Sequence, residues 1–135
     1  MQLLKIPTVE NDSIYRSVFS AVEYEQKLLN EMFLTDQIDA VNFRIRRSEA
    51  GYRSGWHVAG DPTLIIILRG TVRIILRNND FKDFSSGDMF IAKDFLPENI
   101  EFNPEFHGHR AELIGADALE AVHIKLKIGI FLNTT

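Results

Sequence analysis

Short apolar stretches alternate with turn residues along most of the chain after Val41. Runs of this kind, rich in β-branched side chains and recurring about every ten residues, are typical of β-sandwiches and β-barrels. Strands are expected over Val41–Arg47, Thr63–Leu68, Thr71–Arg77, Met89–Ala92, Glu112–Ile114 and Leu119–Ile130. The pattern therefore predicts an all-β domain.

Two turns indicate that consecutive strands pair antiparallel. Arg69–Gly70 lies between two β-branched runs, where glycine can supply the positive φ of a tight hairpin, and Asn78–Asp80 predicts the next turn. Side chains alternate between the two faces of a strand. In Leu119–Ile130 this places Val122 and Ile124 on an apolar face and His123 on the opposite one, where we expect it to be solvated and to have no role.

The chain before Val41 gives a weaker signal. Within Val18–Phe33, apolar side chains recur at helix-like spacing, but a strand over Ile14–Val22 fits the same residues. We expect a strand there, followed by irregular or helical chain. One domain, residues 1–135 with a core barrel at about 41–130, accounts for the whole sequence, because no repeat, linker or low-complexity tract divides it.

Composition narrows the classes of partner and compartment. The formal net charge is −4, and no basic run is longer than Arg46–Arg47, so we expect no nucleic acid partner. No apolar run is long enough to span a membrane, and the N-terminus lacks the pattern of a signal peptide. With no cysteine, disulfides and thiol nucleophiles are excluded, and a cytoplasmic location is expected.

One segment resembles a known family. The stretch GYRSGWHVAGDPTLIIILRG, followed by TVRIILRNNDFKDFSSGDMFIAKDF and later by HGHRAELIG, is similar to small single-domain cupins, with RmlC-like jelly-roll barrels and uncharacterised function. The resemblance implies a double-stranded β-helix with a wide mouth. Many cupins bind a divalent metal through His and Glu side chains placed by two motifs. Among the metals the resemblance implies are iron, manganese, nickel and zinc.

This sequence departs from the metal pattern of the family. Counted back from Gly70, the first histidine of the first motif falls on His57, but the second falls on Ala59 and the glutamate on Thr63. In the second motif His109 takes the place of the remaining histidine. The insertion before it blurs the register, so His107 is a rival for that role. A third ligand would have to come from Asp61, from His107 or from water.

The other candidate site residues have both functional and structural interpretations. Trp56, His57, Thr63 and Arg110 are candidates for binding a small organic ligand, although Arg110 could equally form a surface ion pair with Glu105 or Glu112. Arg44 and Arg46 share one side of a strand. We expect that side to face solvent, but if it faces inward the pocket would favour an anionic ligand.

Three functions remain open at this point. The first is a cupin barrel that binds a small organic ligand and has a degenerate metal site. The second is a metal-dependent enzyme of the dioxygenase or isomerase type that uses His57 and His109 as ligands. The third is an interaction protein, with a homodimer expected from its long apolar strands. Whether the protein is an enzyme is left open, because no catalytic residue can be named.

Overall fold

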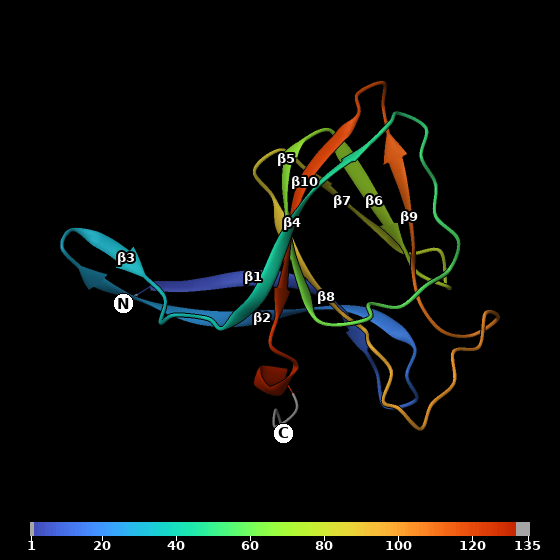
Figure 1. The fold of residues 1–135 in the computed structure, drawn as a ribbon, viewed down its shortest axis with the longest axis horizontal. Helices are drawn as coiled ribbons and strands as arrows, with labels where there is room; N and C mark the ends of the chain where they lie inside the picture. The colour runs from blue at the N-terminus through green and yellow to red at the C-terminus, as the bar shows by residue number, and fades with distance from the viewer. Residues whose placement is uncertain (1, 132–135) are drawn as a thin grey trace.

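The structure, a computed structural model, describes residues 2–131 and is built almost entirely of β-strands (Figure 1). The elements are β1 (Gln2–Asn11), β2 (Ser17–Leu29), β3 (Met32–Leu34), β4 (Ala40–Ser48), β5 (Thr63–Arg69), β6 (Thr71–Ile75), β7 (Phe81–Ser85), β8 (Met89–Lys93), β9 (Arg110–Ile114), β10 (Leu119–Leu126) and the short 3₁₀ helix η1 (Ile128–Phe131). The predicted all-β class is confirmed. No helix within residues 2–131 has the length and apolar character needed to cross a membrane.

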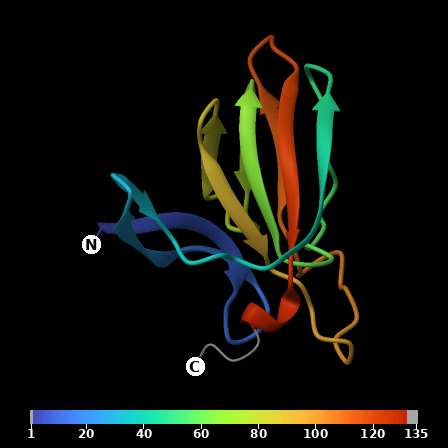
Figure 2. The ribbon, with the colours of Figure 1, turned by 60° about the vertical axis from the view of Figure 1, so that its left-hand side comes forward.

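The strands form two sheets. The larger sheet has the order β3-β2-β1-β8-β5-β10-β4, and the smaller has the order β7-β6-β9. The two sheets face each other in the barrel, and their inward side chains form the main core. This core includes Val9, Ile67, Val72, Phe90 and Leu119. The strands of the larger sheet extend beyond the barrel at the N-terminal end (Figure 2).

Most strands expected after Val41 are present with shifted ends. The predicted Thr71–Arg77 ends at Ile75, and the predicted Leu119–Ile130 ends at Leu126, where the chain turns into η1. Strand β7 was not predicted, because its sequence FKDFS alternates weakly and is mostly exposed. The hairpin at Gly70 has the expected positive φ of 83°, and a Cβ there would lie 2.4 Å from the carbonyl oxygen of Ala118.

In the N-terminal segment the strand expected over Ile14–Val22 is present as β2, which begins at Ser17, but it continues to Leu29 where irregular or helical chain was expected. β1 and β2 form a long antiparallel hairpin, in which Gln2 pairs with Gln26 and Asn11 with Ser17. β1 also pairs in parallel with β8, so the hairpin belongs to the larger sheet. The helix-like spacing was misleading because the strand is stabilised by a partner that the local pattern of residues 18–33 does not reveal.

Candidate functional site

The barrel encloses a cavity of about 250 Å³. Its apolar walls come from both sheets and consist of Val58, Ala59, Gly60, Ile65, Ile67, Val72, Ile74, Phe90, Ala92, Ala111 and Leu119. Five polar side chains complete the lining: Arg46, His57, Thr63, His109 and His123. The cavity thus combines an apolar body with a small number of polar groups, which is the usual composition of a small-molecule site.

His57 and His109 are held together by the backbone. The two residues exchange backbone N–H···O hydrogen bonds of 2.9 Å each, and their ring centroids lie 4.6 Å apart. Gly108 makes this approach possible, because its φ is +91° and a Cβ there would lie 2.5 Å from the carbonyl oxygen of His57. The sequence prediction that these two histidines could face each other is matched by this geometry.

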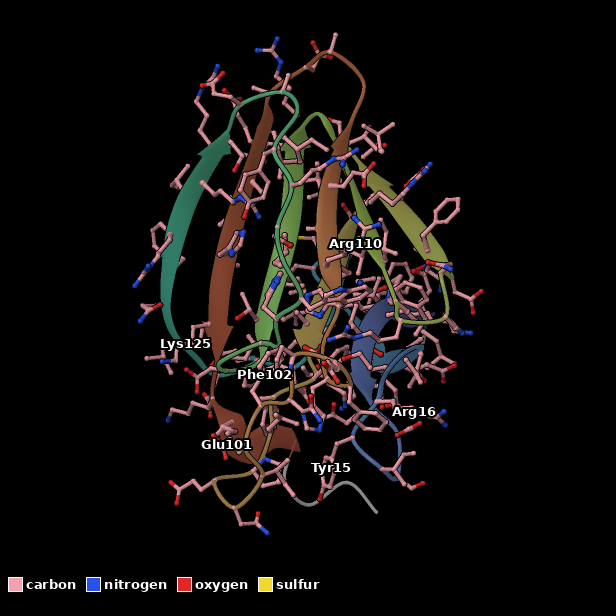
Figure 3. All side chains as sticks on the ribbon, turned by 90° about the vertical axis from the view of Figure 1, so that its right-hand side faces the viewer. Tyr15, Arg16, Glu101, Phe102, Arg110 and Lys125 are labelled. Atoms are coloured by element: carbon pink, nitrogen blue, oxygen red, sulfur yellow. The ribbon has the colours of Figure 1, made fainter. Side chains whose placement is uncertain are left out.

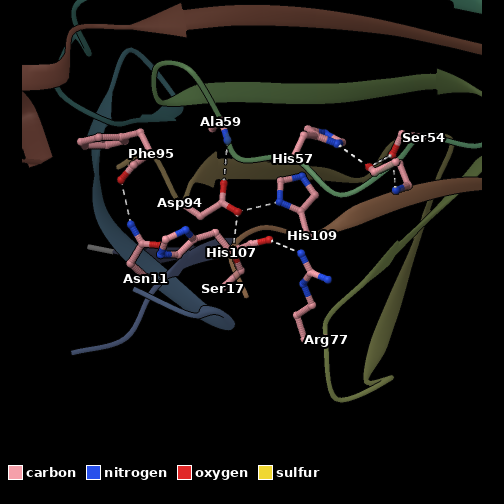
Figure 4. Close-up of polar contacts among 12 residues, drawn as sticks. Asn11, Ser17, Ser54, His57, Ala59, Arg77, Asp94, Phe95, His107 and His109 are labelled. Atoms are coloured by element: carbon pink, nitrogen blue, oxygen red, sulfur yellow. Dashed lines mark hydrogen bonds and ion pairs between the residues drawn. The ribbon is translucent and has the colours of Figure 1, made fainter. Parts of the chain in front are cut away.

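Asp94 anchors His109 from behind the cavity (Figure 4). Its fully buried carboxylate lies 2.6 Å from Nδ1 of His109 and accepts hydrogen bonds from the Ser17 hydroxyl at 2.6 Å and the Ala59 backbone N–H at 2.9 Å. Burial by itself would raise the pKa of Asp94, but the hydrogen bonds from His109, Ser17 and Ala59 outweigh it and lower the pKa. The carboxylate is therefore charged at neutral pH.

This anchoring fixes the chemistry of the His109 ring. Because a carboxylate can only accept hydrogen bonds, Nδ1 of His109 carries the proton in the contact with Asp94. Nε2 of His109 has no hydrogen-bond partner among the described residues and is the ring atom available to a ligand. His57 is arranged similarly, since its Nδ1 lies 3.0 Å from the carbonyl oxygen of Gly55 and is tied to the backbone.

The arginines of β4 correct a sequence expectation. Arg46 lines the cavity, and Arg44 lines an adjoining pocket with Asn42, Asp61, Thr63, His123 and Lys125. The solvent-facing assignment was wrong for Arg46, because pairing with β10 sets the register, whereas Arg44 on the same side of the strand is exposed. Arg46 lies opposite Ala121, which is fully buried, and Arg44 lies opposite His123. The polar side of β4 is therefore its inner side.

His123 also lies inside the barrel, so the expectation that it is a solvated surface residue was wrong. It pairs with Arg44 on one side and with Ile65 on the other, and its buried Nε2 has no hydrogen-bond partner in the described part of the chain. Burial lowers the pKa of His123, and the positive charges of Arg46 and Arg44 lower it further. His123 is thus a neutral ring, with one unsatisfied nitrogen, beside two cations.

The remaining predicted residues are divided between the cavity and the outside. Thr63 lines the cavity, but Trp56 and Arg110 do not. Instead, the guanidinium carbons of Arg77 and Arg110 lie 4.0 and 5.7 Å from the centre of the Trp56 ring. Arg110, labelled on β9 in Figure 3, forms an ion pair with Glu112 at 3.2 Å. That ion pair is one of the two surface contacts considered from the sequence.

His107 is not brought to His57. Its Nδ1 accepts a hydrogen bond from the backbone N–H of Asn103 at 2.8 Å, and its buried ring packs against Phe102 and Phe106. This residue stabilises the loop before β9. It does not line the cavity, so the structure places only His109 of the two rival histidines there.

No protein-family model matches the chain, and no curated protein matches it. Similar folds are found among solved structures. A cupin superfamily protein from Desulfitobacterium hafniense covers 93% of this chain and 77% of its own at 15% identity, with a TM-score of 0.45. The match to the cupin domain of Schizosaccharomyces pombe Cnp3 covers 98% of this chain and 95% of that domain at 13% identity, with a TM-score of 0.45. The match to ToxT from Vibrio cholerae covers 67% of this chain and 32% of the ToxT chain at 10% identity, with a TM-score of 0.50.

The two-sheet barrel has the architecture of a jelly roll, as the sequence predicted, with histidines from two distant segments meeting inside it. At these sequence identities the likeness concerns the fold and leaves the ligand and the reaction to be argued from the site itself.

The donor set of this barrel falls short of the divalent metal site that the resemblance implies. Such sites use three or four protein donors, whereas the motif positions here hold two imidazoles, His57 and His109, with Ala59 and Thr63 at the other two. Within residues 2–131, no group of three or more His, Cys, Asp or Glu side chains is arranged to hold a metal ion. The carboxylate of Asp94 contacts His109, Ser17 and Ala59, and that of Asp61 forms an ion pair with Lys125 at 2.8 Å.

Asp94 and Ser17 are the site residues that the sequence did not reveal. They lie 77 positions apart and meet only because β1 pairs with β8. Asp94 comes just after the predicted strand Met89–Ala92 and before Phe95, so an acidic side chain there lies between two apolar segments. That position is the one signal that could have singled it out, because a buried carboxylate requires hydrogen-bond donors from elsewhere.

Proposed function

We propose that this cupin barrel binds a small organic anion, with the carboxylate of the ligand beside Arg46 and the cavity histidines and its apolar body against the walls. The observation that carries the proposal is the inward direction of Arg46 next to His123, whose buried Nε2 has no partner among residues 2–131. A buried polar atom without a partner is costly, and a carboxylate oxygen would satisfy Nε2 of His123 by accepting a hydrogen bond from its N–H.

The size and lining of the cavity favour a small ligand. A volume of about 250 Å³ is below the range of about 300 to 1,000 Å³ that is usual for drug-sized ligands. Most of the lining is aliphatic, with Phe90 as the aromatic side chain. A monocarboxylate with a short aliphatic chain or a single ring fits these dimensions. The ToxT structure contains a carboxylic acid with an aromatic body. That fold likeness makes aromatic acids sensible first probes.

Replacing Arg46 by alanine is expected to weaken binding of benzoate and hexanoate by about 10-fold to 100-fold, because a charged hydrogen bond inside a cavity contributes about 1.5 to 3 kcal/mol. Isothermal titration calorimetry measures this directly. Benzamide and hexanamide, which have the same shape without the charge, are expected to bind more weakly than the acids to the wild-type protein, and this difference is expected to be smaller in the Arg46→Ala variant.

Arg47→Ala is the matched control. Arg47 is the next residue on β4, but its side chain points outward and pairs with Glu49 and Glu120. Its removal is expected to leave the affinity for both acids unchanged. Equal binding of acids and amides to the wild-type protein would contradict the proposal. So would stoichiometric metal in the purified protein that is lost in a His57→Ala, His109→Ala double variant, which would favour the metal-dependent enzyme instead.

Binding of the acids is expected to strengthen as the pH falls from about 7.5 to 5.5. Burial lowers the pKa of His57 below its ordinary value of 6.5, and nearby His109 adds to that effect; His123 is shifted in the same direction. A bound carboxylate favours the charged imidazole, so it raises both pKa values and takes up protons. Calorimetry in buffers of different ionisation enthalpy measures this uptake. A His123→Asn variant should take up fewer protons, and an unchanged affinity across this pH range would count against the assignment.

A further inference from the structure

A second pocket, of about 270 Å³, adjoins the cavity on the inner side of β4 and β10. Thr63 and His123 line both spaces, so a ligand that passes these two side chains reaches from one into the other. The second pocket has an entirely polar lining, whereas most of the cavity is aliphatic. Below it is called the polar pocket, and its lining residues are Asn42, Arg44, Asp61, Thr63, His123 and Lys125.

The pairing of β4 with β10 explains why these polar side chains gather in one place. Arg44 lies opposite His123 on the inner side of the sheet. The next inner pair in one direction is Asn42 with Lys125, and Arg46 comes next in the other direction. Side chains two positions apart on a strand point to the same side, about 7 Å from each other. The two arginines are therefore anchored side by side, one at each pocket.

Arg44 is the cation of the polar pocket that lacks a counterion. Lys125, labelled in Figure 3, forms an ion pair with Asp61 at 2.8 Å, and each neutralises the charge of the other. Among residues 2–131, by contrast, the side chain of Arg44 forms no hydrogen bond or ion pair. The remaining lining residues carry no charge when His123 is neutral, so the polar pocket holds one uncompensated positive charge.

We propose that the ligand of this protein is a dicarboxylate, whose second carboxylate binds Arg44 in the polar pocket. The inference rests on the proposed function, which places the first carboxylate beside Arg46. The carbon chain of the ligand passes His123 and Thr63, the side chains common to both spaces. Because the two arginines are anchored about 7 Å apart, a chain of about six carbons has a suitable length.

The test is isothermal titration calorimetry at about pH 7, where carboxylates are ionised, with hexanoate, adipate and 6-aminohexanoate. These ligands share a six-carbon chain and one carboxylate, and their other end is uncharged, negative and positive, respectively. Adipate is expected to bind about 3-fold to 10-fold more tightly than hexanoate, because it gains one partly exposed ion pair, and 6-aminohexanoate more weakly. Without a cation at this place hexanoate would bind more tightly than adipate, since a charged end costs more to remove from water than a methyl group.

Arg44→Ala is expected to abolish the advantage of adipate over hexanoate. The side chain is exposed on an edge strand, so the variant is expected to fold, which circular dichroism checks. Arg47→Ala is the matched control, because it removes the same charge from the other side of β4, where Arg47 pairs with Glu49 and Glu120. This control is expected to keep the wild-type ratio of the two affinities.

The outcomes separate this inference from the proposed function. If hexanoate binds through Arg46 but adipate binds no more tightly, the dicarboxylate is wrong and the proposed function stands. An advantage of adipate that persists in Arg44→Ala would also overturn the inference. So would tightest binding of 6-aminohexanoate, which would identify Asp61 as the group that recognises the second charge. If neither acid binds, the proposed function and this inference both fail.

Discussion

An Asp94→Ala variant is expected to lose about 3 to 5 kcal/mol of folding free energy, because a buried carboxylate is removed from the hydrogen-bond donors that surround it. The change leaves the Nδ1–H of His109, the Ser17 hydroxyl and the Ala59 N–H without their acceptor in a site that water does not reach. Urea unfolding followed by circular dichroism measures the loss. An Asp94→Asn variant keeps the shape and one acceptor oxygen, so an intermediate loss is expected.

The pH dependence of the same variants separates charge from packing. Because the fold lowers the pKa of Asp94, its contribution is fully present above the ordinary value of 3.8 and is lost as the pH falls through the lowered value. The wild-type protein should therefore lose stability more steeply below pH 3.8 than Asp94→Asn does. Asp83→Ala, which removes an exposed ion pair with Arg73, should cost about 1 kcal/mol or less. A loss for Asp94→Ala no larger than for Asp83→Ala would contradict this account.

Gly108→Ala is the second change with a large expected effect. At a φ of +91° an alanine is strained by about 1 to 2 kcal/mol. Its Cβ would also lie 2.5, 2.8 and 3.0 Å from backbone atoms of His57, which adds about 1 to 3 kcal/mol of overpacking. The strand bridge between His57 and His109 would have to open, so benzoate binding should weaken together with the melting temperature.

Gly87→Ala provides the comparison for this prediction. Gly87 has the same φ of +91°, but a Cβ there meets nothing within 4 Å. Its variant therefore measures the conformational strain alone. The difference between the two melting temperatures, at about 3 to 5 °C per kcal/mol, reports the contact with His57. If both variants melt at the same temperature, the close approach at Gly108 does not constrain the histidine pair.

The strands after Val41 could be predicted because each is a short apolar run bounded by turn residues, and His57 and His109 became candidates through the motif spacing that the resemblance implies. The direction of Arg46 could not be predicted in the same way. Alternation shows that Arg44 and Arg46 share a side, but only the pairing with buried Ala121 on β10 decides which side faces the cavity. The direction of His123 could not be predicted for the same reason, because the middle of its strand is apolar on both faces and alternation alone does not show which face is inside.

The N-terminal hairpin and Asp94 escaped prediction for a related reason. β2 is half polar and mostly exposed beyond Tyr24, so its strand state depends on pairing with β1 rather than on a pattern of its own. Asp94 gains its partners from Ser17, Ala59 and His109, which lie in three separate parts of the sequence. Contacts at such long sequence separation are fixed by topology.

The edge strand β4 carries Arg46 on its inner side and Ile45 on its outer side, at neighbouring positions. Because side chains alternate along a strand, a slip of one residue against β10 would exchange the two sides, removing the arginine from the cavity and putting an isoleucine in its place. The charge of the cavity is therefore set by the register of a single pair of strands.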